Sequence, residues 1–251
     1  MKIIDAHTHI DSCMSAIHFS KKSYSVEELI NEMDQNCVDR SVVMGGGRPC
    51  QIMYQNELIK KAVKEYPERL IGFARINPFW DDHFIEILKT CINQYHFRGV
   101  KLHPTQDAYP LLNYRVFRVI EEAIKLNVPI IIHSGSIPYA MPGQIADLAA
   151  LYPESKIIMA HAGKLELWQH TLPSAKRVNN LYLEFSFTHL TSVREAIDAI
   201  GEKRVLYGSN WPAGSMRPWI EGIKKVHIFT KKEKELFLGK NFLNIIEDSL
   251  V

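Results

Sequence analysis

The amino-acid sequence predicts an α/β fold, a (β/α)8 TIM barrel that forms a single domain over residues 1–251. Two observations predict it. The chain has 251 residues without a Gly/Ser-rich or charged linker, and one complete barrel takes about 250 residues. Eight short apolar runs, rich in β-branched residues, alternate with segments of helical periodicity. That alternation indicates a parallel sheet, because parallel strands need a crossover connection.

The predicted strands follow one another at regular intervals, at 3–9, 41–45, 70–76, 99–103, 129–133, 156–161, 181–185 and 205–209. Helices are expected between them, at 25–36, 51–66, 83–94, 114–126, 145–152 and 192–200. The first helix begins at Ser25 and Glu28, which form a capping-box pattern. Residues 234–248 are expected to add a C-terminal helical extension that packs on the outside. An open doubly wound sheet is the alternative, but its Gly-rich loop after the first strand is missing.

Composition and charge favour a protein that acts on a small molecule. The formal net charge is only +2 and no basic stripe is present, so nucleic acid is not an expected partner. No apolar stretch approaches the roughly 18 residues of a membrane span, so no membrane association is expected. The 4 cysteines show no pairing pattern, which is typical of a reducing compartment and predicts a cytoplasmic protein. The sequence leaves the oligomeric state open, with a homodimer as one option.

The sharpest local motif is His7-Thr8-His9, at the downstream end of the first predicted strand. Side chains two residues apart on a strand point to the same face. Asp5, His7 and His9 are therefore expected to face the barrel interior. The downstream ends of all strands in such a barrel converge on the face that holds the active site. Two imidazoles at that place supply half of a tetrahedral metal site.

Further histidines end later strands. His133 follows an Ile-Ile-Ile run and His161 follows Ile-Ile-Met-Ala. Three histidines with one open coordination position form a recognised catalytic zinc arrangement. The sequence therefore predicts one divalent metal ion, with zinc expected, and a bound water whose pKa the metal lowers towards neutrality.

The motifs around these histidines resemble the amidohydrolase superfamily, and within it the amidohydrolase 2 branch of metal-dependent barrels. The resemblance is carried by HTH at 7–9, GVKLHP at 99–104, IIIHSG at 130–135, IIMAHAG at 157–163 and LYGSNWP at 206–212. That branch includes hydrolases of amides, esters and lactones and non-oxidative decarboxylases of small acids. The resemblance implies that His7, His9 and His133 are metal ligands. It also implies that His161 handles protons or polarises the substrate beside the metal.

One position departs from the family pattern. The last strand of family members usually ends with an Asp that ligates the metal and accepts a proton from its water, whereas this chain has Asn210. The Asn side chain can offer its carbonyl oxygen as a neutral ligand, but it cannot act as a carboxylate base. Metal binding should therefore be weaker, and proton removal would fall to His161 or to the substrate.

Two inward-facing residues are expected on the fourth predicted strand. Lys101 is expected to act from behind the ligands by pairing with a buried acid such as Asp5 or Glu184, because the missing Asp argues against a carboxylated lysine between two metals. His103 is expected to contact the substrate or to support the ligands. Asp5 is also assigned to this supporting shell.

The loops after the strands are expected to shape a substrate pocket. Arg48, after the second strand, could bind a substrate carboxylate through two hydrogen bonds, and Trp211 could line the pocket. From the sequence we expect a hydrolase of a small amide, ester or lactone, with metal-bound water as nucleophile. One alternative is a metal-dependent decarboxylase of a small unsaturated or aromatic acid. The other is a binding protein in which Asn210 has removed the activity.

Overall fold

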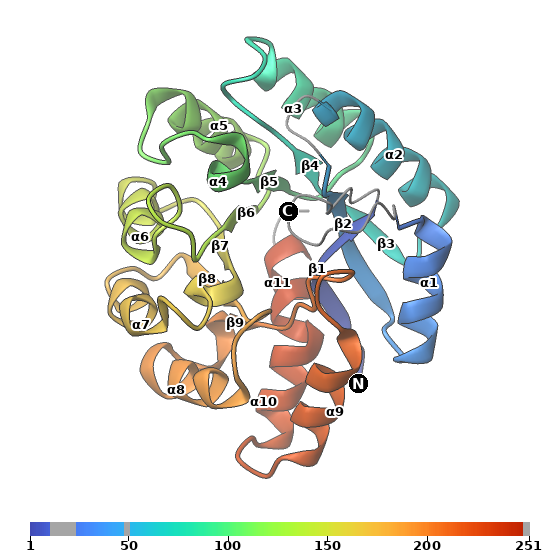
Figure 1. Ribbon diagram of the computed structural model, residues 1–251, viewed down its shortest axis with the longest axis vertical. Coiled ribbons are helices and arrows are strands. Elements are labelled where there is room, and N and C mark those ends of the chain that lie inside the picture. The colour runs from blue at the N-terminus through green and yellow to red at the C-terminus, as the bar shows by residue number, and fades with distance from the viewer. Residues whose placement is uncertain (11–23, 48–50, 248–251) are drawn as a thin grey trace.

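The computed structural model describes residues 1–10, 24–47 and 51–247. Helices surround a ring of strands when the molecule is viewed down its shortest axis (Figure 1). Every strand pair with a register is parallel. The predicted (β/α)8 barrel is confirmed.

All eight predicted strands are present, the third as two short pieces. Their bounds are β1 (Ile4–Ile10), β2 (Arg40–Gly45), β3 (Leu70–Gly72), β4 (Ala74–Arg75), β5 (Val100–Leu102), β6 (Ile130–His133), β7 (Ile157–Ala160), β8 (Leu181–Glu184) and β9 (Val205–Leu206). β3 and β4 are one strand interrupted at Phe73, whose amide donates to the Val43 carbonyl at 3.0 Å. The ring closes between β1 and the segment after β9, where the His9 amide donates to the Trp211 carbonyl at 2.8 Å.

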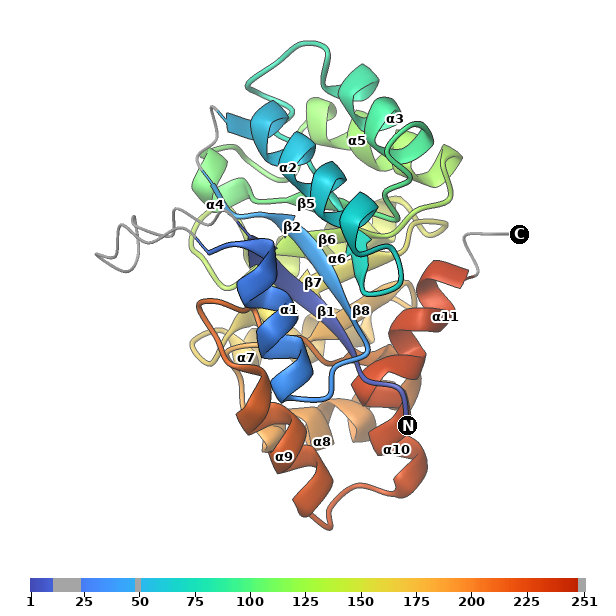
Figure 2. The same ribbon diagram turned by 90° about the vertical axis from the view of Figure 1, so that its right-hand side faces the viewer.

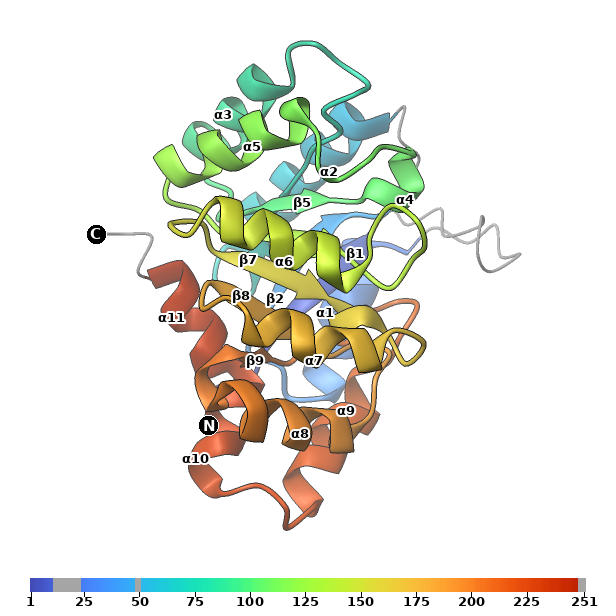
Figure 3. The same ribbon diagram turned by 90° about the vertical axis from the view of Figure 1, so that its left-hand side faces the viewer.

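The chain between and after the strands forms helices, most of which lie around the outside (Figures 2 and 3). They are α1 (Val26–Gln35), α2 (Ile52–Glu65), α3 (Phe84–Asn93), α4 (Pro104–Asp107), α5 (Tyr114–Lys125), α6 (Pro142–Leu151), α7 (Trp168–Lys176), α8 (Leu190–Ile200), α9 (Met216–Lys225), α10 (Lys231–Glu235) and α11 (Asn241–Glu247). The predicted capping box is present, since the Glu28 amide donates to Ser25 Oγ at 3.3 Å and the Ser25 amide donates to Glu28 Oε2 at 2.9 Å. None of the helices in the described part of the chain has the length and hydropathy of a membrane span.

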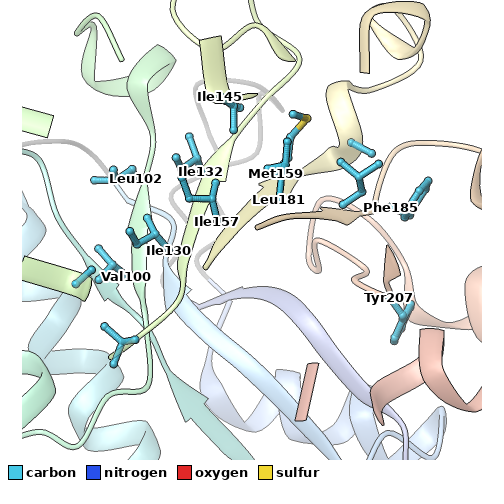
Figure 4. Close-up of a cluster of buried hydrophobic side chains, with 14 of the residues drawn as sticks. Val100, Leu102, Ile130, Ile132, Ile145, Ile157, Met159, Leu181, Phe185 and Tyr207 are labelled. Atoms are coloured by element: carbon cyan, nitrogen blue, oxygen red, sulfur yellow. The ribbon is translucent and has the colours of Figure 1, made fainter. Parts of the chain in front are cut away.

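The apolar core has two layers, because successive strand residues face opposite sides of the barrel wall. The outward layer packs under the helices and includes Val100, Ile130, Ile132 and Ile157 (Figure 4). The inward layer includes Ile131 on β6, whose neighbours on both sides belong to the outer layer. This alternation directs the polar residues at the strand ends into the mouth of the barrel.

The C-terminal helix corrects one expectation. Helix α11 does not pack on the outer wall. Its residues Phe242, Ile245 and Ile246 join the inward-facing cluster, and the Phe242 ring lies 6.1 Å from that of Phe73. In Figures 2 and 3, α11 lies at the end opposite α4, which directly follows β5. Within the described part of the chain, the helix thus closes the amino-terminal end of the barrel, opposite the carboxyl ends of the strands.

Candidate active site

A cavity of about 820 Å³ lies at the carboxyl ends of the strands. The residues that line it include all five histidines that the sequence places at strand ends, namely His7, His9, His103, His133 and His161. Asn210 and Lys101 also line it. The barrel therefore brings together residues that lie far apart in the sequence.

A bulge in β1 sets the direction of the first two histidines. The register pairs Asp5 with Ser41 and Thr8 with Val43, so β1 contains one extra residue over this interval. Ile4 and Ala6 belong to the inward cluster, so Asp5 between them faces outward, contrary to the expectation. After the bulge, the Nε2 atoms of His7 and His9 lie 3.1 Å apart in the cavity.

Asp5 supports the site from behind the strand. Its Oδ1 accepts hydrogen bonds from the amides of His7 and Ser209, each at 3.0 Å. These bonds tie the end of β9 to the start of the histidine motif. Burial raises the pKa of the Asp5 carboxyl to about 7, and the hydrogen bonds from Ser209 and His7 oppose that rise.

Glu184 organises the histidines, although the sequence suggested only a pairing with Lys101. Its Oε2 accepts hydrogen bonds from His7 Nδ1 at 2.8 Å, from the His161 amide at 3.0 Å and from Ser186 Oγ at 3.0 Å. Its Oε1 accepts from the Ser186 amide at 2.6 Å. In the sequence, the signal that could have indicated this role is an acidic residue at the end of an apolar strand run. With four donors, this carboxylate positions other groups and is not free to act as a base.

His161 and His133 form a second pair. His161 Nδ1 lies 2.6 Å from Ser186 Oγ, and His133 Nε2 lies 3.1 Å from Ser136 Oγ. The other two ring nitrogens, His161 Nε2 and His133 Nδ1, lie 3.2 Å apart. The Ser186 hydroxyl donates to Glu184, so it accepts from His161 Nδ1–H, and the lone pair of the neutral His161 ring is on Nε2.

Burial keeps the histidines neutral. It is the largest cause that lowers the pKa of His7, His103, His133 and His161 well below the ordinary value, and it lowers that of His9 to about 3. Nearby positive charge on Lys101 adds to this effect at each ring. The neutral ring is the form that binds metal ions.

The donor set fits a divalent metal ion. Glu184 fixes the proton of His7 on Nδ1, which leaves the Nε2 lone pair directed at the cavity, as is usual for ligating histidines. The 3.1 Å between His7 Nε2 and His9 Nε2 is close to the roughly 3.4 Å that separates two nitrogens of a tetrahedral zinc site. A different set, His7, His161 and Glu184, also has ligand atoms within 4.8 Å of one another, but Glu184 Oε2 already accepts three hydrogen bonds.

Lys101 does not form the expected ion pair. No carboxylate in the described ranges lies within 4.0 Å of its Nζ, which instead donates to His7 Nε2 at 3.3 Å. Burial is the largest cause that lowers the pKa of Lys101 to about 7, followed by the positive charge of Arg75. Lys101 is thus a buried amine that points at the histidine cluster.

The sequence did not indicate the buried ion pair behind the mouth. Arg75 Nη2 lies 2.7 Å from Asp107 Oδ1, and both side chains are inaccessible to solvent. The Arg75 charge lowers the pKa of His9 and His103. An arginine within the apolar run 70–76 was the only sequence signal for this pair.

The remaining predicted residues differ in their placement. His103 lines the cavity, its ring stacks on His133 at 3.9 Å, and its Nδ1 accepts from the Gln106 amide at 3.1 Å, so Nε2 carries the proton of the neutral ring. Asn210 lines the cavity with a φ of 55°, a left-handed conformation that Asn and Asp tolerate.

The other two substrate-binding predictions find no support. Trp211 does not line the cavity, because its ring is buried in the outer core and packs edge-on against Tyr24 at 5.4 Å. Arg48 lies outside the described residues.

Comparison with known proteins identifies one family and one relative of known activity that match this chain. Residues 4–241 match the amidohydrolase family. A 2-amino-3-carboxymuconate-6-semialdehyde decarboxylase from Dictyostelium discoideum is 25% identical over 237 residues, which cover 77% of this chain and 65% of that protein. The chain thus spans less than two thirds of this relative's length.

Solved structures show the same fold at low identity. A 5-carboxyvanillate decarboxylase from Novosphingobium aromaticivorans, an Asp-to-Asn variant with bound manganese, has a TM-score of 0.81 at 13% identity, with 98% of this chain and 97% of that chain covered. A 4-oxalomesaconate hydratase from Rhodopseudomonas palustris has a TM-score of 0.74 at 18% identity, with 99% and 97% covered.

Proposed function

Because the chain belongs to the amidohydrolase family, we propose that it is a metal-dependent lyase that decarboxylates a small unsaturated or aromatic acid. One observation carries the proposal, namely that the described residues around the histidine cluster offer no free carboxylate base. Glu184 is engaged by four donors, and the last strand leads to the neutral Asn210. Hydrolysis needs a group that removes a proton from water, whereas loss of carbon dioxide does not.

The residues present suit the ion that this chemistry uses. His7, His9 and His133 are the proposed ligands, with Glu184 and Asp5 holding His7 in place. A bound divalent ion, zinc or manganese, would supply positive charge that holds substrate oxygens and polarises the π system next to the reacting carbon. The neutral Asn210 leaves this site one negative charge poorer than a site with Asp.

His161 is the proposed proton donor. Its Nδ1–H is held by Ser186, which is held by Glu184, so Nε2 is the nitrogen that can take up and deliver a proton. An anionic substrate counteracts the burial that lowers the His161 pKa and so favours the protonated ring. The proton passes from Nε2 to the carbon bearing the carboxylate, and the C–C bond then breaks. Its electron pair returns to the π system, carbon dioxide leaves, and solvent restores the proton.

Two relatives point the same way. The curated relative and one of the compared structures are named as decarboxylases, and their reaction is the one that our geometric argument selects. Hydrolysis stays the second candidate, because the neutral Nε2 of His161 could accept a proton from water in the way that a general base does.

The experiment compares two substrate panels. Protein loaded with zinc or manganese is assayed against small aromatic and unsaturated acids for carbon dioxide release, and against lactones, esters and amides for hydrolysis. We expect carbon dioxide release from at least one acid. His161→Asn should abolish this release, because Asn lacks an equivalent of Nε2. The variant should still fold, since Asn keeps an amide donor for Ser186 and tolerates the His161 φ of 63°.

The control is Lys176→Gln, an exposed change on α7 that should leave the rate unchanged. Hydrolysis of the second panel without carbon dioxide release would contradict the proposal and restore the hydrolase prediction. Inactivity towards both panels, in protein that retains its metal, would favour the binding-protein alternative.

A further inference from the structure

Lys164 is a second cation in the cavity, and the proposed mechanism does not use it. Its side chain lines the cavity, is half-buried, and lies over Gly135, where an added Cβ would come within 2.6 Å of Lys164 Cγ. Its Nζ donates to Ser136 Oγ at 3.5 Å. No carboxylate in the parts of the chain that the structure describes lies within 4.0 Å of this ammonium group.

The backbone at Lys164 is strained. Its φ of 56° and ψ of −179° lie in a region that glycine populates almost alone. The three preceding residues, 161–163, also have positive φ angles of 63°, 43° and 79°. The turn is held by its own contacts, because the Lys164 amide donates to the His161 carbonyl at 2.6 Å. Glycine would adopt this conformation at position 164 without strain, so a lysine there lowers the stability of the fold. A functional role of the lysine side chain would account for its presence despite this loss.

The position of Lys164 separates it from the proton donor. Its Nζ contacts Ser136, Ser136 contacts His133 Nε2 at 3.1 Å, and His133 Nδ1 contacts His161 Nε2 at 3.2 Å. Ser136 and His161 therefore contact opposite nitrogens of the His133 ring, which separates a group bound by Lys164 and Ser136 from the group next to His161 Nε2. Among the described residues that line the cavity, Glu166, at the exposed rim, is the one carboxylic acid, whereas Lys101 and Lys164 are both lysines.

We propose that Lys164 and Ser136 bind a second anionic group of the substrate, which stays in the product. The substrate class is then a small acid with two anionic groups, such as a dicarboxylic acid. The ammonium and hydroxyl donate to one carboxylate, while the reacting carboxylate lies at the histidine cluster. This inference rests on the proposed function for the identity of the reacting group, but the binding of the second group can be tested without turnover.

The test measures the affinity for benzoate and for 3-carboxybenzoate by calorimetry, using wild-type protein, Lys164→Gln, Lys164→Gly and the control Lys176→Gln. In wild type and control, the dianion should bind at least about 10-fold more tightly than the monoanion, as expected for a charge-assisted hydrogen bond. Both Lys164 variants should lose this preference. Lys164→Gly should also unfold at a higher temperature than Lys164→Gln, because it removes the strain.

Equal affinity for the two ligands in wild type, or a preference that survives in both Lys164 variants, would overturn the proposal. Failure to bind either ligand would also overturn it. A preference that depends on Lys164 in a protein that decarboxylates no acid would uphold this subsite and reject the proposed function. The same measurement on His7→Ala should retain the preference, since Ser136 contacts the ring of His133 and not that of His7.

Discussion

Replacing Glu184 with Gln should weaken metal binding although the residue is not proposed to touch the metal. Four hydrogen bonds reach this carboxylate, three at Oε2 and one at Oε1. The Gln amide has one oxygen and one NH2 group. Whichever way it is oriented, its NH2 group meets at least one of the donors from His7, His161 or Ser186.

The magnitude follows from these contacts. A buried donor left without an acceptor costs about 1–3 kcal/mol, so the metal-free variant should lose at least that much stability. Loss of the carboxylate behind a ligating histidine typically reduces metal affinity about 10–100-fold, because the ring is no longer held in the right tautomer and orientation. The two effects share one origin and should appear together.

The assay has two parts. Chelator competition gives the metal affinity, and thermal or urea unfolding of metal-free protein gives the stability. Glu154→Gln is the matched control, because Glu154 is exposed in the turn after α6 and should change neither quantity. Wild-type metal affinity in Glu184→Gln would refute the assignment of Glu184 as the residue that orients His7.

Three further predictions concern the ligands, the last strand and the C-terminal helix. His7→Ala, His9→Ala and His133→Ala should each abolish binding of about one metal equivalent in elemental analysis, and full retention in all three would reject the ligand set. Asn210→Asp should tighten metal binding and raise any hydrolytic rate by about 10²–10⁴-fold. An unchanged affinity and rate would show that residue 210 does not point at the metal. Phe242→Ala should destabilise the fold by about 3–5 kcal/mol in urea unfolding, whereas a loss below about 1 kcal/mol would contradict the tight closure by α11.

The sequence predicted the barrel and the meeting of the histidines because both depend on regular rules. Apolar β-branched runs mark strands, and parallel strands place their carboxyl ends on one face. His7, His9, His133 and His161 therefore could be placed in one cavity without knowledge of any contact. Helix α7 was missed, since Pro173 and its mixed polarity obscure the helical period.

Features that depend on a single residue or a tertiary contact could not be predicted. The bulge in β1 adds one residue, so strict alternation placed Asp5 on the wrong side of the strand. Helical periodicity located α11 but not its packing surface, because an apolar helix face fits the barrel end as well as the outer wall. The role of Glu184 depends on donors from 7, 161 and 186, which only the folded chain brings together.

The two ends of the barrel divide stability from function. At the amino end, α11 buries Phe242, Ile245 and Ile246 against apolar strand residues, and each such side chain contributes about 1.5–3 kcal/mol. At the carboxyl end, two features reduce the stability of the fold. Burial disfavours the charges of Lys101 and Asp5, and residues 161–164 have positive φ angles. Helix α11 closes the end of the barrel where no ligand has to enter. The free energy gained by apolar packing at the amino end therefore offsets the backbone strain and the buried charges at the carboxyl end. This allows the strand ends to hold polar groups in fixed positions.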